Sequence, residues 1–405
     1  MISPGFRLSL RVTCLEFSVY KKEVQFLSNP IKWLIPTNKG MKRINLPPGV
    51  SNSYGVVSRR EALRRAAAAG ALISLSPLAG FGVSNAEAAE EALGKFPKHP
   101  QWKFVFVSHV TTNPFWVPLR YGAEDACALL GTSFQWTGSE KSLATEMVNA
   151  FNTAVSAKAD GIAVALVDPS AFNDPVEKAL AAGIPVVSYN ADAKGNKRLC
   201  YIGQDLFLSG KALGQRIVEA VREGEVAGFI ATPGQLNIQP RMDGAREAIK
   251  ESGKNIKLEE IATGPTVNEE LSRIQAYYTG HPDIKGMFAV DAGSTEGVGK
   301  TMAANKLHEK GVHAGGFDLL PTTLDAISKG DLDFTIDQQP YLQGFYTIMV
   351  LFVYKISGGL SGLSDINTGL KFITKGNVDP YLSTQSRFEG SSSQEKVLTR
   401  SGPIS

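Results

Sequence analysis

The chain from Trp102 onward alternates short runs of apolar residues with stretches in which apolar residues recur every three or four positions. Runs of the first kind predict buried strands, and stretches of the second kind predict helices with one buried face. In the first half, strands are expected at 102–110, 132–138, 161–168 and 184–190, with helices such as 117–131 and 143–159 between them. Repeated strand-helix units favour a parallel sheet covered by helices.

A second series of the same kind follows the segment RLCYIGQD at 198–205. Its strands are expected at 225–232, 256–262, 284–290 and 311–318, again with a helix between each pair. Two series that each exceed about 100 residues are more than one core comfortably holds. The sequence therefore predicts an α/β protein of two Rossmann-like lobes, each built on a parallel sheet.

The order of the units implies that the chain passes between the lobes three times, which makes a hinge of three crossings. The crossings are expected near 201–205, 337–339 and 368–372. The N-terminal lobe is then expected to comprise 101–203 and 339–367, and the C-terminal lobe 204–338 and 368–390.

The apolar run FYTIMVLFVY, at 345–354, is ten residues long. A membrane span needs about twenty residues. The run therefore predicts a buried helix.

The segment ahead of the lobes has a different composition. Residues 1–88 hold 12 Lys and Arg but only 4 Asp and Glu, so residues 89–405 carry 30 basic against 35 acidic side chains. Without a basic patch interleaved with aromatic residues in this remainder, we expect no nucleic-acid partner.

The basic segment SRREALRR, at 58–65, precedes an apolar run of small residues that ends at Ala86-Glu87-Ala88. These parts predict a secretory signal over 58–88 that is cleaved after Ala88. Arg59 and Arg60, paired after a serine, resemble a twin-arginine signal, which predicts export to the periplasm. A retained membrane anchor is the alternative, and 1–57 remain an N-terminal extension that fits no export pattern.

The sequence lacks the motifs expected for metal binding, for hydrolase catalysis and for a disulfide framework. The histidines outside the predicted strand ends show no metal-ligand spacing, and no Ser-His-Asp order with an elbow glycine is present, so we expect no metal, no cofactor and no enzymatic activity. Cys127 and Cys200 are too few for a disulfide framework and are expected to be separate buried thiols, with a single bridge as the alternative.

The segment DAGSTEGVGKT, at 291–301, looks at first like a phosphate-binding loop. Five residues separate Gly293 from Gly299, whereas the motif has four, and Ser294 occupies the position that needs glycine. We therefore expect a turn from a strand into a helix, with Asp291 facing a cleft and Ser294 capping the helix.

Polar and aromatic residues follow most of the predicted strands. Parallel strands deliver their carboxyl ends to one edge of a sheet, which is where α/β proteins bind ligands. The candidate ligand-binding residues are His109, Asn113, Phe115, Trp116, Asn190, Asp192, Arg241, Asp291, Asp318 and Gln338.

Four motifs carry a resemblance to a known family: NPFW (113–116), HPDIKGMFAVD (281–291), GGFD (315–318) and DFTIDQQPYLQG (333–344). In order and spacing they resemble the periplasmic solute-binding proteins of sugar ABC transporters, in the ribose-binding branch, over about residues 101–385. The resemblance implies the type I periplasmic binding fold and a non-enzymatic, monomeric protein. Such a protein closes two lobes on a monosaccharide or polyol and delivers it to a membrane permease.

The resemblance also implies roles for the matching residues. Phe115 and Trp116 would stack on the C–H face of a sugar, Asn113 would bond a hydroxyl, and Arg241 would fork onto sugar oxygens. Asp318 and Gln338 match an acidic and an amide ligand, Asn190, Asp192 and Asp291 stand at or beside ligand positions with altered chemistry, and His109 replaces a small hydroxyl residue. Sugar hydroxyls both donate and accept, which suits such side chains, and a C–H face suits an aromatic ring.

Alternatives remain for single residues and for the function. Phe115 or Trp116 could be core residues, Asp318 a helix cap, Arg241 part of a surface ion pair, and His109 a loop cap. An exported oxidoreductase would need a Gly-x-Gly-x-x-Gly turn after its first strand, and a sugar-responsive regulator would need a helix-turn-helix; neither is present. An autoinducer or a nucleoside stays open as a ligand.

The ribose-type members usually carry an Asp-Arg pair after the fourth strand and an Asn after its equivalent in the second lobe. Here these places hold Asn190-Ala191-Asp192 and Asp291. An amide and a carboxylate present different donors and acceptors, so the exchange predicts that D-ribose is not the preferred ligand.

Overall fold

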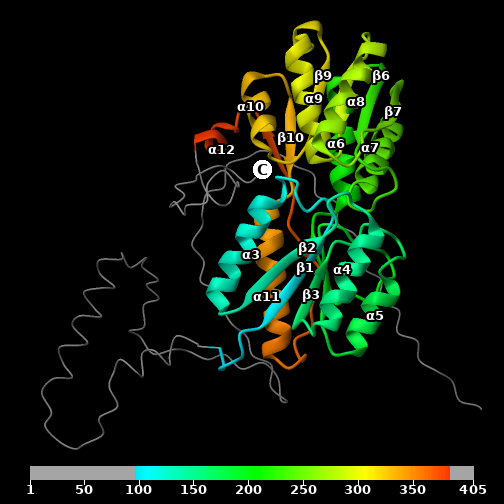
Figure 1. Ribbon diagram of the computed structural model, residues 1–405. Helices are drawn as coiled ribbons and strands as arrows, with labels where there is room; N and C mark the ends of the chain where they lie inside the picture. The colour runs from blue at the N-terminus through cyan, green and yellow to red at the C-terminus, as the bar shows by residue number, and fades with distance from the viewer. Residues whose placement is uncertain (1–95, 384–405) are drawn as a thin grey trace, which may run out of the picture. The chain divides into compact units, whose positions relative to one another are not determined.

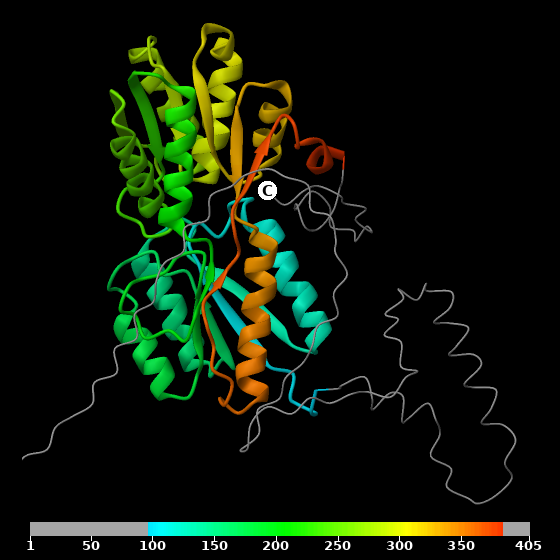
Figure 2. The same cartoon turned by 180° about the vertical axis from the view of Figure 1, so that it is seen from behind.

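Two six-stranded sheets organise the chain in the computed structural model, which describes residues 96–383 (Figures 1 and 2). The sequence predictions for 1–57 and 58–88, and for the end of the range 368–390, lie outside the described residues. The first sheet has the order β11-β5-β4-β3-β1-β2 and the second the order β12-β10-β9-β8-β6-β7. All neighbouring strands are parallel except β10 and β12, which are antiparallel.

We call the elements around the first sheet the first lobe. They are β1 (Lys103–Ser108), α3 (Trp116–Leu130), β2 (Ser133–Gly138), α4 (Ala144–Ser156), β3 (Gly161–Val164), α5 (Asn173–Ala181), β4 (Val186–Tyr189), β5 (Tyr201–Gly203), α11 (Pro340–Ile356) and β11 (Ile366–Asn367).

The elements around the second sheet form the second lobe. They are α6 (Leu206–Ala220), β6 (Gly224–Ile230), α7 (Gln239–Ser252), β7 (Ile256–Ala262), α8 (Val267–Gly280), β8 (Gly286–Ala289), α9 (Ala292–Asn305), the 3₁₀ turn η1 (His308–Lys310), β9 (His313–Phe317), α10 (Pro321–Lys329), β10 (Phe334–Asp337), β12 (Lys371–Thr374) and α12 (Asp379–Ser383).

The strands expected from the apolar runs are present as β1 to β4 and β6 to β9, so the predicted α/β fold with two lobes is confirmed. The central strands are buried along their whole length, as in β3, β4 and β8, because helices cover both faces of each sheet (Figure 1). Sheet membership changes three times along the chain: between β5 and β6, between β10 and β11, and between β11 and β12.

The apolar run at 345–354 lies in α11, which packs against α3 at close range. A Cβ atom on Gly344 would lie 1.9 Å from the carbonyl oxygen of Leu119, and one on Gly122 would lie 2.0 Å from that of Tyr341. Glycine at both positions therefore permits the two helices to approach. None of the helices in residues 96–383 is long and apolar enough to cross a membrane.

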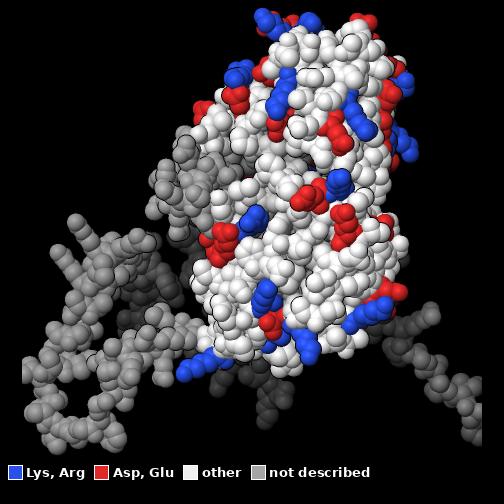
Figure 3. Space-filling view, viewed as in Figure 1, with Lys and Arg blue, Asp and Glu red and all other residues white. Residues whose placement is uncertain are grey.

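The surface charge and the state of the two cysteines match what the sequence predicts. On the face shown in Figure 3, basic and acidic side chains alternate over both lobes, and the described residues there form no extended patch of one sign. Cys127 and Cys200 are both buried and unpaired, as expected.

Candidate ligand-binding site

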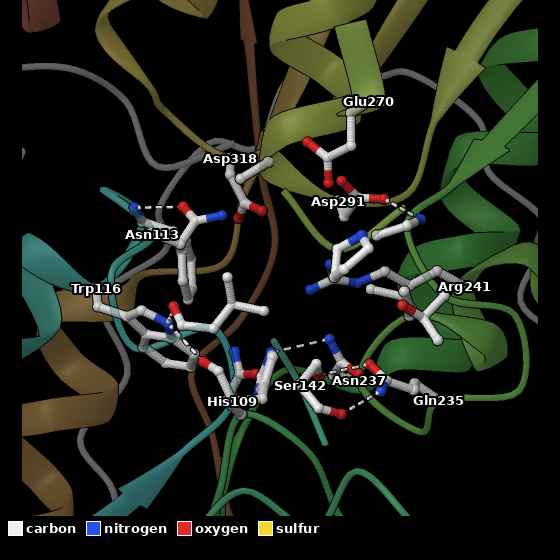
Figure 4. A pocket seen from close by; sticks show the side chains of 18 of the residues that line it. His109, Asn113, Trp116, Ser142, Gln235, Asn237, Arg241, Glu270, Asp291 and Asp318 are labelled. Atoms are coloured by element: carbon white, nitrogen blue, oxygen red, sulfur yellow. Dashed lines mark hydrogen bonds between the residues drawn. The ribbon is translucent and has the colours of Figure 1, made fainter. Parts of the chain in front are cut away.

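A cavity lies between the lobes at the carboxyl ends of the strands (Figure 4). Its empty space is about 540 Å³, including the part open to solvent, which is within the usual range for small-molecule sites. Nine of the ten candidate residues line it: His109, Asn113, Phe115, Trp116, Asn190, Arg241, Asp291, Asp318 and Gln338.

The aromatic wall comes from the turn between β1 and α3. Trp116 is 2% exposed, and its Nε1 donates to the carbonyl oxygens of His109 and Val110, both at 3.1 Å. Phe115 packs edge-to-face on it with ring centroids 4.8 Å apart, and the Phe115 amide donates to Oδ1 of Asn113 at 2.9 Å. Trp116 is thus a core residue and a wall residue at once, and its ring is held in a fixed orientation.

His109 links the two lobes. Its Nε2 lies 3.0 Å from Nδ2 of Asn237, which enters from the loop between β6 and α7. Burial and, to a smaller extent, the charge of Arg241 together lower the pKa of His109 to about 3, so the ring is neutral near pH 7. Because an amide nitrogen only donates, the proton lies on Nδ1. That atom is buried and has no hydrogen-bond partner among the described residues.

Arg241 reaches into the cavity from α7 (Figure 4) and is 2% exposed, so it is no member of a surface ion pair. Its Nη1 donates to the carbonyl oxygen of Val290 at 3.0 Å, and its guanidinium lies 4.2 Å from the centre of the Phe317 ring. Nε is buried without a partner among the described residues. Burial lowers the pKa of Arg241, and Asp318 opposes that shift by favouring the charged form.

Asp318 and Gln338 form one hydrogen-bonded unit where the chain leaves the second sheet. Oδ1 of Asp318 accepts from Nε2 of Gln338 at 2.7 Å, and Oε1 of Gln338 accepts from Nδ2 of Asn190 at 3.3 Å and Nε2 of Gln343 at 3.1 Å. Burial raises the pKa of Asp318 to about 6, against the opposing effect of Arg241. The unit joins side chains of both lobes at the cavity wall.

The backbone at two of these positions adopts the left-handed region. Asn190 has φ of 62° and Asp318 has φ of 76°. Residues other than glycine adopt this conformation at a cost, which asparagine and aspartate tolerate best. Asp318 does not cap the following helix, whose N-cap is Leu320. Both side chains are turned to the cavity instead.

Asp291 caps helix α9, which corrects the expectation that Ser294 does so. The helix begins at Ala292, and Oδ1 of Asp291 accepts from the Ser294 amide at 2.8 Å. Ser294 lies in the first turn and supplies the amide N–H that is capped, so the capping side chain is that of Asp291. Oδ2 of Asp291 accepts from the Ala231 amide at 2.9 Å, so this carboxylate also ties α9 to the end of β6.

Asp192 does not line the cavity. Its Oδ2 pairs with Nη2 of Arg198 at 2.6 Å, and its Oδ1 accepts from Oγ of Ser188 at 2.7 Å. It lines a separate groove beside the crossing, together with Asp365. Arg198 lies in the same loop, between β4 and β5, and donates to both carboxylate oxygens of Asp192. This bidentate ion pair holds Asp192 away from the cavity.

Further lining residues were not predicted, among them Ser142, Gln235, Asn237 and Glu270. Ser142, Gln235 and Asn237 come from loops, and Glu270 comes from the first turn of α8. The segment GPTVNEE carries a capping-box pattern at Thr266 and Glu269, so the next glutamate reads as solvent-facing. A charged residue that follows a capping box does not by itself indicate a binding site, so the sequence did not predict Glu270.

No group of three or more His, Cys, Asp or Glu within residues 96–383 is arranged to hold a metal ion.

Comparison with known proteins agrees with this geometry. The family model described as a periplasmic binding protein domain matches residues 104–358. The chain belongs to the periplasmic binding protein family. Among family members, it is 50% identical over 323 residues to the xylose/arabinose-binding protein XylF of Sulfolobus acidocaldarius, covering 75% of this chain and 78% of that protein.

Other periplasmic binding proteins are more distant. The ribose import binding protein RbsB of Escherichia coli is 27% identical over 232 residues, covering 56% of this chain and 76% of that protein. A crystal structure of an ABC transporter solute-binding protein from Burkholderia graminis, in complex with D-arabinose, superposes with a TM-score of 0.65 at 25% identity. It covers 70% of this chain and 99% of that chain. These relatives are binding proteins, and an exported oxidoreductase is not favoured.

Proposed function

We propose that this protein captures a neutral monosaccharide or polyol between its lobes and delivers it to an ABC transporter, without catalysing a reaction. The observation that carries the proposal is a cavity with one aromatic wall and several unpaired polar atoms. Nδ1 of His109, Oδ1 of Asn237 and Nε of Arg241 are all buried without partners among the described residues. Buried polar groups are costly unless bonded, and sugar hydroxyls both donate and accept.

The relatives favour a pentose. XylF is named for xylose and arabinose, and the Burkholderia graminis structure holds D-arabinose. RbsB, which is named for ribose, is much less similar in sequence. We propose that the protein resides in the periplasm or on the outer side of the membrane, acts as a monomer, and docks on a membrane permease.

Calorimetry with a sugar panel tests this function. We expect D-xylose, L-arabinose or D-arabinose to bind more tightly than D-ribose, because Asn190 and Asp291 alter the acceptors on both sides of the cavity. The panel should include hexoses, polyols and nucleosides. Absence of binding to every neutral sugar and polyol would remove the proposal. D-ribose binding most tightly would remove only the preference for xylose or arabinose over ribose.

The lobes meet across the cavity through polar contacts. Ser142 and Gln235 exchange two hydrogen bonds: Oγ of Ser142 to Oε1 of Gln235 at 2.9 Å, and Nε2 of Gln235 to the Ser142 carbonyl at 3.0 Å. The Leu236 amide donates to the Val167 carbonyl at 2.9 Å. We propose that these contacts form on closure around the crossings, with the N-terminal lobe as 101–203 and 339–367 and the C-terminal lobe as 204–338 and 368–390.

Solution scattering tests closure. D-xylose should make the wild-type protein more compact, and Gln235→Ala should weaken affinity by about tenfold because two hydrogen bonds of the closed form are lost. Gln239→Ala is the matched control, since the Gln239 side chain bonds Gly234, Asp243 and Glu260, all within its own lobe. No compaction with bound sugar, or equal effects of both variants, would contradict closure through these contacts.

Export by the twin-arginine route is a separate proposal, which rests on Ser58-Arg59-Arg60. Replacing Arg59 and Arg60 by lysine should abolish accumulation of the mature protein outside the cytoplasm, as measured by cell fractionation. The same change at Arg64 and Arg65 is the control and should have little effect. Undiminished export of the first variant would show that another route is used.

A further inference from the structure

Glu270 is an acidic residue buried in the cavity wall without an obvious partner. It is 3% exposed, and its Oε2 accepts no hydrogen bond from an N–H or O–H group of the described residues. Its side chain points to Asp291, as Figure 4 shows. An ionised carboxylate that is buried without donors is costly, so this glutamate requires an explanation.

The chain makes room for this contact. Gly293 lies in the first turn of α9, and a Cβ atom there would lie 1.6 Å from Oε2 of Glu270. The absence of a side chain at Gly293 allows the Glu270 carboxyl to reach Asp291. The pairing is therefore built into two helices, α8 and α9.

The two carboxyl groups have different surroundings. Burial raises the pKa of Asp291, but the two backbone N–H bonds that it accepts, from Ser294 and Ala231, and its place at the N-terminus of α9 favour its charged form. Glu270 has no such donors among the described residues, so it can form the hydrogen bond to Asp291 only when it is protonated and its O–H donates. The proton of the pair therefore resides on Glu270.

Three acidic groups among the described residues act on Glu270, and the cation of the cavity, Arg241, acts on its partner Asp291. The acidic groups are Asp291 and Glu296 on the α9 side and Glu269 on the same helix as Glu270. Glu296 is paired with Lys300 at 2.5 Å. Burial, the charge of Asp291 and the hydrogen bond to Asp291 raise the pKa of Glu270 to about 10.

We propose that Glu270 and Asp291 share one proton, and that this carboxylic acid–carboxylate pair is a specificity element that selects a neutral, hydroxyl-donating ligand. The inference rests on the proposed function of the cavity. With the single O–H used between the two groups, their remaining oxygens only accept hydrogen bonds. A sugar hydroxyl can donate to them, whereas a sugar-acid carboxylate placed against this pair would meet a negative charge and no donor from either carboxyl group.

The pH dependence of D-xylose binding, measured by calorimetry, tests the pair. Wild-type affinity should be constant near pH 7 to 8 and fall by about tenfold towards pH 11, as Glu270 ionises and places a second charge in the wall. Glu270→Gln keeps a neutral donor of the same shape, so it should retain most of the affinity at pH 7 and lack this alkaline loss. Glu270→Ala should bind weakly at every pH.

Glu269→Gln is the matched control and should follow the wild-type profile, because Glu269 lies on the same helix but outside the cavity wall. An identical alkaline loss in wild type and Glu270→Gln, or no loss in wild type, would overturn the proposal. A second test needs only the wild-type protein: its affinities for D-xylose and D-xylonate are compared in a competition experiment. We expect a preference for D-xylose of at least about a hundredfold, and equal affinities would overturn the proposal. Failure of the wild type to bind any neutral sugar at pH 7 would instead contradict the proposed function.

Discussion

Replacing Arg241 by lysine is expected to weaken sugar binding by about a hundredfold, because lysine cannot reproduce the planar fork of donors in a closed, water-poor cavity. Arg241 is the only Lys or Arg among the described residues that line the cavity. Its Nη1 donates to the Val290 carbonyl at 3.0 Å and its Nη2 donates to Oε1 of Gln204 at 3.5 Å, which leaves Nε as the guanidinium nitrogen that has no partner among the described residues. Lysine keeps the positive charge but loses this geometry, and calorimetry with D-xylose measures the difference.

Arg246→Lys is the control for this change. Arg246 lies on the same helix, is 41% exposed at its side chain and pairs with Asp243 and Glu260 at the surface. Surface pairs of this kind contribute little, so affinity and stability should be almost unchanged. If Arg241→Lys binds as tightly as the wild type, Arg241 holds the lobe together and does not bind the ligand.

Glu270→Gln is expected to stabilise the ligand-free protein near pH 7, by on the order of 3 kcal/mol at most. The pKa of Glu270 is about 10 in the folded protein, against an ordinary value of 4.5. Between these values the folded state holds a proton that the unfolded state releases. The free energy of unfolding of the wild type therefore falls as pH rises through this window. Glutamine has no proton to lose and escapes this penalty.

Urea unfolding at several pH values measures the effect. The gain from Glu270→Gln should disappear below about pH 4, where both states of the wild type are protonated, and should grow toward neutral pH. Glu269→Gln is again the control and should show no such trend. A gain that is independent of pH would mean that glutamine packs better at this site and that ionisation of Glu270 is not the cause.

Much of the fold could be predicted because its signals are local. The strands at 161–164 and 286–289 are buried along their whole length, and the strand at 103–108 is buried after Lys103. Burial on both faces requires covering helices. Since parallel strands align their carboxyl ends, the residues after them had to share an edge, and nine of ten candidates do line one cavity.

The two predictions that were wrong concern residues whose roles depend on non-local contacts. Asp192 follows a strand like its neighbours, but Arg198 pairs with it and holds it outside the cavity. Ser294 has a side chain that could cap a helix, but Asp291 occupies the N-cap position, and its carboxylate accepts the hydrogen bond from the Ser294 amide. Both outcomes depend on which partner lies nearer in space, and the spacing of residues along the sequence does not predict that.

By itself, the sequence determined the two α/β lobes, the three passages between them and the chemical types gathered at the strand ends, because apolar periodicity and strand direction follow from local residue order. Only the tertiary structure decided how those groups act together. It placed Asn237 against His109 and Glu270 against Asp291, from segments far apart in the chain. Protonation follows from burial and neighbouring charge, which exist only after folding, so the neutral ring of His109 and the protonated carboxyl of Glu270 are properties of the folded cavity.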